Sequence, residues 1–243
     1  TEVVDGSYTP PSPFGAITLY AKWTANTNNA ITWDDQSATT ASSGGSTTYT
    51  TAQAISTIRS TDPIRTGYTF GGWFTQTNGA GTQVTNGSYT PPTPYGTVTL
   101  YAKWTANTNN AITWDDQSAT TASSGGSTTY TTAQPITTIR TTAPLRTGYT
   151  FGGWFTQTNG AGTQVTNGSY TPISPYGTIT LYAKWTANTY SVTYNGNSNT
   201  SGTVPSNATA TYNSTFTVAS NIGSLVRTGY TFAGWNTAAD GSG

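Results

Sequence analysis

The chain has 243 residues, with eight Lys or Arg, eight Asp or Glu, and neither His, Cys nor Met. Because the opposite charges cancel, the chain has no basic surface for nucleic acid, and the lack of His and Cys removes the commonest metal ligands, thiol nucleophiles and imidazole bases. We therefore expect no cofactor, no metal site and no nucleic-acid partner.

The rest of the composition favours a folded β protein outside the cell. Aromatic residues make up 13% of the chain, too many for a disordered segment, and Thr, Tyr, Trp and Val favour strands. The sequence contains no run of about 18 apolar residues, so we expect no membrane span in this segment. A chain with few charges and no thiols suits a cell-surface, extracellular location. The absence of an initiator Met and of a signal peptide indicates a mature product or an excised segment.

The sequence repeats itself every 81 residues. Two sets of tryptophans are spaced by this period: Trp23, Trp104 and Trp185, and Trp73, Trp154 and Trp235. Since 243 is three times 81, the chain holds three lengths of one unit. This period is longer than a solenoid turn and long enough for a small domain, so it predicts a tandem array of small domains.

Within the unit, strand and turn patterns alternate along the chain. Ile17–Trp23 reads I-T-L-Y-A-K-W, and its alternation of apolar and polar side chains predicts a half-buried strand. The polar, linker-like stretch T-A-N-T follows, and Ala30–Trp33 begins a second strand. Turn residues cluster at 43–45 and at 78–79, and between them Gly67–Phe74 predicts an aromatic strand.

Three motifs carry a resemblance to a known family: R-T-G-Y-T-F-G-G-W at 65–73, R-T-G-Y-T-F-A-G-W at 227–235 and T-L-Y-A-K-W at 99–104. They resemble the Listeria–Bacteroides repeat of bacterial surface proteins, which includes the B repeat of internalin-type proteins. The resemblance covers essentially the whole chain. It implies a β-grasp-like fold in tandem copies on secreted or wall-anchored proteins, with units that open on a strand like 190–194 and close on L-Y-A-K-W.

This phase predicts two complete units, which we call repeat 1 (26–105) and repeat 2 (107–186). Residues 188–243 are then the N-terminal part of repeat 3, which lacks its closing strand. Residues 1–24 are a C-terminal strand fragment that would complete a preceding unit. The expected fold class is mostly β, with tandem β-grasp-like small domains in a linear array and one unit divided between the two ends.

Three interpretations of the divided unit stay open. The sequence is a window cut from a longer array, or the two ends meet within one chain, or successive chains assemble head-to-tail. In the third case, strand fragment 1–24 of one chain completes repeat 3 of another and buries a set of apolar side chains. This burial would contribute about 5–10 kcal/mol before entropic costs. The candidate inter-chain residues are Ile17, Leu19, Ala21, Trp23, Tyr230, Phe232 and Trp235.

Two sets of polar residues are candidates for chemistry. Asp34 and Asp35 are adjacent, so on a strand they point to opposite faces and cannot flank a sugar as a glycosidase requires. We interpret them as a solvated turn, and a weak cation site with Asp34 or Asp240 lacks any loop motif. The lysines Lys22, Lys103 and Lys184 recur once per unit. An isopeptide bond needs a recurring acid that the repeats lack, so we expect the Lys22 stem to cover Tyr20 with its ammonium in water.

Two functions follow from these patterns. The first is a structural repeat protein of a bacterial extracellular stalk or filament, whose partners are copies of itself or flanking repeats of the same chain. The alternative is an adhesin module that binds glycan or a host surface protein through exposed aromatic residues, for which Tyr20, Tyr49 and Phe74 are candidates. We expect no enzyme, because neither an acid–base pair nor a nucleophile–base pair recurs in every unit.

Overall fold

The computed structural model describes residues 3, 6, 8–10, 12 and 15–243. The chain forms two compact units, one within residues 1–65 and 69–105, the other within 66–68 and 106–243. Almost all regular structure is β, and the described residues contain no α-helix, only two short 3-10 turns. The prediction of a mostly β chain built from small sheets in tandem is confirmed.

Repeat 1 contains one five-stranded sheet. Its elements are β1 (Asn29–Asp34), β2 (Thr48–Tyr49), β3 (Tyr68–Phe74), the 3-10 turn η1 (Thr77–Gly79), β4 (Gln83–Val84) and β5 (Val98–Ala106). The strand order is β2-β1-β5-β3-β4, so the last strand lies in the centre of the sheet. It runs parallel to β1, with Val98 opposite Ile31 and Tyr101 opposite Asp34. The strands predicted at Ala30–Trp33 and Gly67–Phe74 are therefore confirmed.

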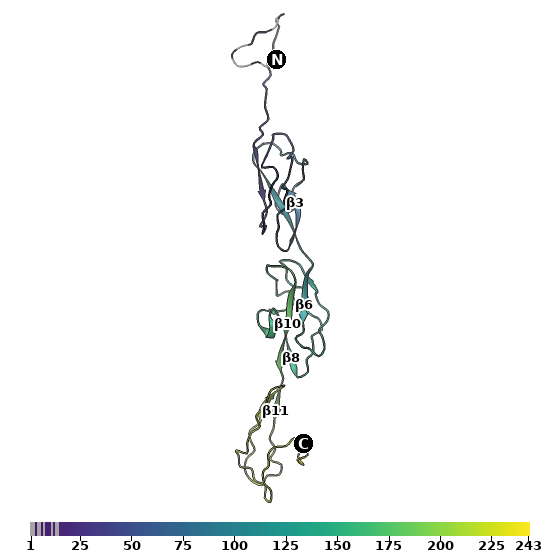
Figure 1. The fold of residues 1–243 in the computed structure, drawn as a ribbon, viewed down its shortest axis with the longest axis vertical. Helices are drawn as coiled ribbons and strands as arrows, with labels where there is room; N and C mark the ends of the chain where they lie inside the picture. Colours follow the sequence, from purple (N-terminus) through teal and green to yellow (C-terminus); the bar gives the residue numbers. More distant parts are fainter. Residues whose placement is uncertain (1–2, 4–5, 7, 11, 13–14) are drawn as a thin grey trace. The chain divides into compact units, whose positions relative to one another are not determined.

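Repeat 2 reproduces this sheet in the order β7-β6-β10-β8-β9. Its elements are β6 (Asn110–Asp115), β7 (Thr129–Tyr130), β8 (Tyr149–Phe155), η2 (Thr158–Gly160), β9 (Gln164–Val165) and β10 (Ile179–Ala187). Figure 1 shows β10 between β6 and β8. Strand β10 is parallel to β6 and antiparallel to β8, so it is the strand that joins the two edges of the sheet.

The alternating pattern of the closing strand explains the core of each complete repeat. In β5, Leu100 and Ala102 are fully buried, and in β10, Leu181 and Ala183 are equally buried. They pack with a buried tryptophan of the aromatic strand, Trp154 in repeat 2. Burying side chains of this size stabilises each sheet by about 1.5–3 kcal/mol per large residue, so the closing strand carries much of the stability of the repeat.

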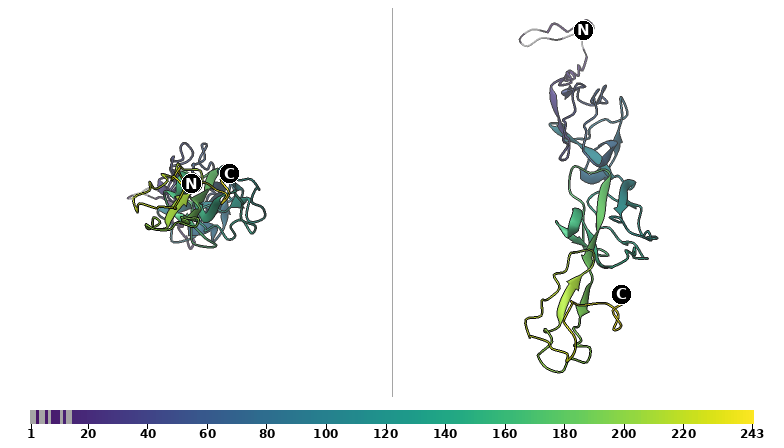
Figure 2. Two further views of the ribbon diagram at one scale, coloured as in Figure 1. Left: turned by 90° about the horizontal axis from the view of Figure 1, so that it is seen from below. Right: turned by 60° about the horizontal axis from the view of Figure 1, so that its bottom comes forward.

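Repeat 3 has only a two-stranded sheet, formed by β11 (Thr189–Val192) and β12 (Ala208–Thr211). This ribbon is seen next to the label β11 in Figure 1 and, in yellow-green, in the right-hand view of Figure 2. Residues 231–236, which correspond to β8 of repeat 2, form no strand. Its buried apolar side chains are Tyr194 and Leu225, so the core of repeat 3 is much smaller than the cores of the complete repeats.

The prediction of a half-buried strand at Ile17–Trp23 is wrong for the single chain. Residues 15–26 form no strand, and the side chains of Ile17, Leu19, Ala21 and Trp23 are exposed. The reason is that a closing strand lies between the first and third strands of its own repeat. Among the described residues, no strand pairs with residues 17–23, so this segment has the pattern of a core strand but lies in no sheet.

Candidate functional site

The closing strand of a complete repeat makes a defined set of contacts on both of its edges. Along β6, Ile179 lies opposite Ile112 and Leu181 opposite Trp114. Along β8, Ala183 lies opposite Trp154, and after a register shift Trp185 lies opposite Phe151. The closing strand therefore inserts its apolar face between two aromatic strands.

The tryptophan at the end of the closing strand occupies a specific site. The ring of Trp185 lies 5.6 Å from that of Phe151, and its Nε1 donates a hydrogen bond to the carbonyl of Asp116 at 2.9 Å. In repeat 1, Trp104 lies 5.5 Å from Phe70 and donates to the carbonyl of Asp35 at 3.0 Å. An aromatic edge and one carbonyl thus define the place of this ring in both complete repeats.

Repeat 3 contains aromatic pairs like those of this site, and its residues 231–236 lie in no sheet. The ring of Trp235 packs against Tyr194 at 4.8 Å and against Phe232 at 5.3 Å, and its Nε1 donates to the carbonyl of Ala219 at 2.8 Å. Phe232 remains 40% exposed and Tyr230 remains 68% exposed. Of the predicted assembly residues Tyr230, Phe232 and Trp235, the structure brings Phe232 and Trp235 into contact, while the ring of Tyr230 contacts Arg227.

The other predicted assembly residues lie together on an exposed segment. Residues 17–23 read I-T-L-Y-A-K-W, the same seven residues as 179–185 in β10. Leu19 is 60% exposed and Trp23 is 89% exposed, whereas Leu181 at the equivalent place is buried. The same seven-residue sequence is thus a buried strand at 179–185 and an exposed segment outside any strand at 17–23. The 81-residue period is the signal that indicates this identity, whereas the contact of Trp235 with Tyr194 comes only from the structure.

The paired aspartates hold their own loop. The Oδ1 atom of Asp34 accepts a hydrogen bond from the backbone N–H of Gln36 at 2.9 Å, in an exposed turn. Asp35 is half-buried, and its Oδ2 accepts from the N–H of Ser42 at 3.0 Å. The prediction of a solvated turn therefore fits Asp34 and is wrong for Asp35, which anchors the loop that follows β1. Among the described residues, no three or more acidic side chains gather to hold a metal ion.

The lysine of each complete repeat packs differently from the prediction. A Cβ atom added at Gly79 would lie 2.5 Å from Cδ of Lys103, so the lysine stem runs directly over this glycine. Its Nζ lies 5.3 Å from the ring centroid of Phe74. Lys103 thus covers a glycine turn and an aromatic ring, because the 3-10 turn η1 approaches the closing strand closely. Lys184 repeats the arrangement on Phe155 at 5.4 Å.

Two of the three candidate glycan-binding aromatics are buried. Tyr49 is buried and donates its hydroxyl hydrogen to the carbonyl of Gly96 at 2.9 Å, and Phe74 is buried under Lys103. Tyr20 alone of the three is exposed. The expectation that Tyr49 and Phe74 offer a sugar-binding surface is therefore wrong, because both side chains complete the sheet of their own repeat.

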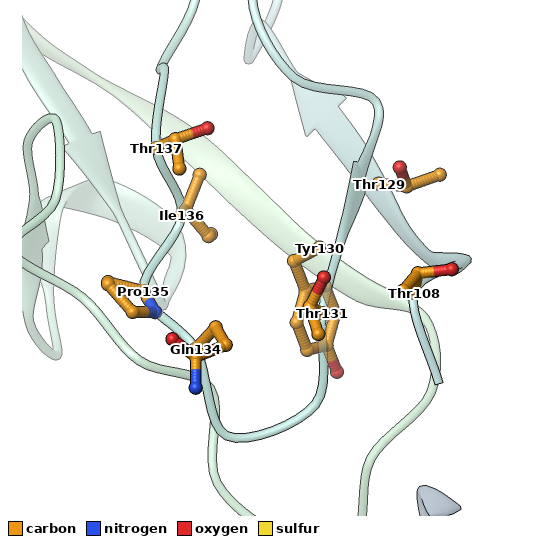
Figure 3. Close-up of a pocket in the computed structure, with 8 residues that line it drawn as sticks. All are labelled: Thr108, Thr129, Tyr130, Thr131, Gln134, Pro135, Ile136 and Thr137. Atoms are coloured by element: carbon orange, nitrogen blue, oxygen red, sulfur yellow. The ribbon is translucent and has the colours of Figure 1, made fainter. Parts of the chain in front are cut away.

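A shallow hollow of about 320 Å³ lies on repeat 2 (Figure 3). Hydroxyl side chains dominate its lining, which comprises Thr108, Thr129, Tyr130, Thr131, Gln134, Pro135, Ile136 and Thr137. Its one aromatic ring belongs to Tyr130, which is buried and bonded through its hydroxyl to the carbonyl of Gly177 at 2.9 Å. The hollow therefore has no exposed ring on which a sugar would stack.

Among the described residues, three titratable groups have a shifted pKa. Burial raises the pKa of Tyr89 and of Tyr170, and the neighbouring hydroxyls of Tyr49 and Tyr130 raise them further. Hydrogen bonds from the hydroxyl and the N–H of Ser242 hold the pKa of Asp240 below its ordinary value. Burial of a tyrosine and local capping of a carboxylate explain these shifts as consequences of folding.

The sheet that recurs in repeats 1 and 2, together with its aromatic core, defines a class of protein: tandem small β domains. A family model described as the Listeria-Bacteroides repeat domain matches residues 29–103, 104–184 and 190–243. The chain belongs to this family, which confirms the resemblance carried by the R-T-G-Y and L-Y-A-K-W motifs. No solved structure matches the chain.

Several bacterial proteins are similar to this chain. A protein of Evansella cellulosilytica provisionally named a Gly-rich membrane protein is 42% identical over 40% of this chain and 12% of its own length. A second, provisionally named a membrane protein, is 33% identical over 93% of this chain and 31% of its own length. Internalin H of Listeria monocytogenes is 34% identical over 53% of this chain and 21% of its own length. The chain therefore spans less than a third of each of these relatives.

These relatives fit a structural or surface role for the repeats, and none of the matches indicates a catalytic family. Within the part of the chain that the structure describes, no helix is long and apolar enough to cross a membrane.

Proposed function

We propose that the chain is a structural segment of a bacterial extracellular stalk or filament, and that copies join head-to-tail by strand complementation. In this arrangement, residues 17–23 of one copy enter repeat 3 of another copy and take the place that β10 has in repeat 2. The repeats 26–105 and 107–186 would then be complete units, and 188–243 would be completed by the neighbour. In a longer protein, the next closing strand of the same chain would make the same contacts.

The observation that carries this proposal is the identity of residues 17–23 with residues 179–185. Tyr194 packs on Trp235 as Trp114 packs on Trp154, so we align Tyr194 with Trp114, 80 residues earlier. With this alignment, the register of β10 would place Ile17 opposite Val192 of β11 and Leu19 opposite Tyr194 on one edge. On the other edge it places Ala21 opposite Trp235 and Trp23 opposite Phe232. Six of the seven predicted assembly residues would meet in these pairs. The seventh, Tyr230, would lie opposite Ala25 in the same register.

The burial of apolar surface supports insertion of the strand. Exposed apolar side chains at 17, 19 and 23 would become buried, which contributes about 5–10 kcal/mol before the entropic cost of association. The inserted strand would also pair the edge of β11 and a segment at 230–236 that forms no strand by itself. A contact of this kind uses two different surfaces, so it propagates into an open chain of copies.

A pair of complementary variants tests the proposal. Leu19→Asp places a charge on the inserting strand, and Phe232→Asp places one on the receiving surface. Each variant alone should stay monomeric in sedimentation velocity, whereas an equimolar mixture should form dimers, because each partner keeps one working half. The wild-type chain should form longer species, visible as fibres by electron microscopy.

Tyr20→Ser is the matched control, because residue 20 lies on the opposite face of the same segment. It should associate far more strongly than Leu19→Asp. A wild-type chain that stays monomeric at all accessible concentrations would refute assembly between copies, and so would a mixture of the two charged variants that forms no dimer.

The second candidate is an adhesin module for glycan or a host surface protein. Tyr20, which is exposed, supports it, while the burial of Tyr49 and Phe74 removes two of its three candidate contacts. A glycan array probed with the wild-type chain tests it, and saturable binding that Tyr20→Ser abolishes would favour it. We propose no catalytic role, because Oδ1 of Asp34 and Oδ2 of Asp35 each accept a backbone N–H of their own loop and the third repeat has no such pair of aspartates.

A further inference from the structure

A glycine and two tyrosines meet where repeat 2 passes into repeat 3. Gly148 has a φ of +76°, and a Cβ atom added to it would overlap the ring of Tyr212. The same ring lies 5.5 Å from that of Tyr149, edge to face at 79°. Glycine leaves room for this approach, and the T-shaped ring pair fixes the direction from which Tyr212 arrives. We call this set of contacts the repeat joint.

The backbone of one asparagine connects the two sides of the joint. The N–H of Asn188 donates to the carbonyl of Gly148 at 2.9 Å, and the carbonyl of Asn188 accepts from the N–H of Tyr212 at 2.8 Å. The hydroxyl of Thr150 also donates to Oδ1 of Asn188 at 2.7 Å. Asn188 therefore bonds the aromatic strand of repeat 2 and the second strand of repeat 3 at once.

The same contacts recur elsewhere in the second compact unit, to which residues 66–68 belong. The N–H of Asn107 donates to the carbonyl of Gly67 at 2.9 Å, and the carbonyl of Asn107 accepts from the N–H of Thr132 at 2.9 Å. The ring of Tyr176 lies over Gly67, and 6.4 Å from Tyr68 at 84°. Tyr176 and Tyr212 come from segments that do not correspond to each other in the repeats. What recurs is a tyrosine ring that covers the glycine of the R-T-G-Y motif.

Two surfaces of the chain have the form of separate halves of such a joint. Gly229 and Tyr230 end the third R-T-G-Y motif, and Gly229 has a φ of +80° with nothing within 4 Å of an added Cβ. Tyr95 lies 81 residues before Tyr176 and is 39% exposed. Asn26 already accepts a hydrogen bond from the N–H of Thr51 at 2.8 Å, as Asn107 does from Thr132.

We propose that these halves form a third repeat joint between two copies of the chain. Tyr95 of one copy covers Gly229 of the other and packs edge to face on Tyr230, while the N–H of Asn26 donates to the carbonyl of Gly229. This inference rests on the proposed strand complementation, because insertion of residues 17–23 brings Ala25 opposite Tyr230 and so delivers Asn26 to Gly229. The connection between copies is then the same as the connection within a copy.

The joint assigns Tyr95 a role that the strand contacts alone do not give it. An edge-to-face tyrosine pair strengthens an interface by about 3- to 10-fold in the association constant. Tyr95→Ala should therefore weaken head-to-tail association by about this factor, whereas Tyr95→Phe keeps the ring and should associate like the wild type. Tyr230→Ala, on the opposite half, should weaken association to a similar extent.

Tyr176→Ala is the matched control, because Tyr176 has the same place in repeat 2 and its ring covers Gly67 of the same unit. It should leave the dissociation constant between copies unchanged. The measurement is sedimentation velocity of the full chain over a concentration series, with the unfolding midpoint of each variant recorded to show that repeat 1 stays folded.

The outcomes separate the two proposals. If the wild-type chain does not associate, the strand complementation fails and the joint fails with it. If the wild type associates and both Tyr95→Ala and Tyr230→Ala associate equally well, the complementation stands and the joint between copies is overturned. Weaker association of these two variants, with Tyr95→Phe and Tyr176→Ala unchanged, supports the joint.

Discussion

Strand β10 and residues 17–23 share seven identical residues in opposite surroundings. Leu181 is fully buried between β6 and β8, while Leu19 is mostly exposed. Trp185 is held by Phe151 and the carbonyl of Asp116, while Trp23 is 89% exposed. The comparison teaches that the alternating pattern specifies a strand that needs two neighbours, and that burial depends on whether the chain around it provides them.

The largest expected difference lies between Leu181→Ala and Leu19→Ala. Removing the buried side chain of Leu181 should destabilise repeat 2 by about 2–5 kcal/mol, because it leaves a cavity in the core. The same change at Leu19 should alter the stability of the monomer by less than about 0.5 kcal/mol. Denaturant unfolding at low protein concentration measures both, and equal losses would contradict the difference in burial.

Gly160→Ala and Gly241→Ala compare the lysine contact in a complete and an incomplete repeat. Both glycines have positive φ, but a Cβ at Gly160 would also lie 2.5 Å from Cδ of Lys184. We expect Gly160→Ala to cost about 1–3 kcal/mol, and Gly241→Ala to cost less because nothing lies within 4 Å of its Cβ. Thermal unfolding of the two variants tests this order, which the reverse ranking would contradict.

The hydroxyl of Tyr130 offers a smaller test of the complete repeat. It donates to the carbonyl of Gly177 and accepts from the N–H of the same residue at 3.2 Å. Tyr130→Phe should cost about 1 kcal/mol, because it leaves these partly buried backbone groups of Gly177 without a partner. Tyr20→Phe, on the exposed copy of the closing strand, should change nothing in the same unfolding experiment. A loss at Tyr20 as large as that at Tyr130 would show that residue 20 is already packed.

The smallest effect is expected from pH. With no His and no Cys, the side chains give both regions an almost flat stability between about pH 5 and pH 9. The pKa of Tyr170 is raised by burial, so folding favours its neutral form. That contribution is complete below the ordinary tyrosine pKa and is lost as pH rises through the raised value. In a titration of tyrosinate absorbance against pH, Tyr170→Phe should remove a tyrosine that ionises at a pH above the ordinary tyrosine pKa. An unchanged titration curve would contradict the raised pKa of Tyr170.

Much of the fold could be predicted from the sequence. The 81-residue period and the apolar alternation predicted the closing strand, which forms as β5 and β10, and the aromatic strand, which forms as β3 and β8. Both elements follow from a local alternation of side chains that can be read from the segment itself. The predicted strand at Ile17–Trp23 does not form in the single chain. A local alternation of side chains carries no information on whether neighbouring strands are present to pair with the segment.

Contacts between distant segments were the part that the sequence did not predict. Tyr49 is buried because Gly96, 47 residues further along the chain, accepts its hydrogen bond. Lys103 packs on Gly79 because a 3-10 turn folds over the closing strand. The cover of Gly148 by Tyr212 is likewise a long-range contact, and the aromatic spacing alone did not distinguish a tyrosine at a joint from one in the core.

Hydrogen exchange across a concentration series is the decisive experiment for strand complementation, because it follows residues 17–23 and 230–236 in the same sample. The account predicts that the amides of residues 17–23 and 230–236 exchange rapidly at low concentration and become protected together as concentration rises, while those of β10 stay protected throughout. Rapid exchange of both segments at every concentration would contradict assembly by strand complementation, and protection independent of concentration would contradict completion by a second copy.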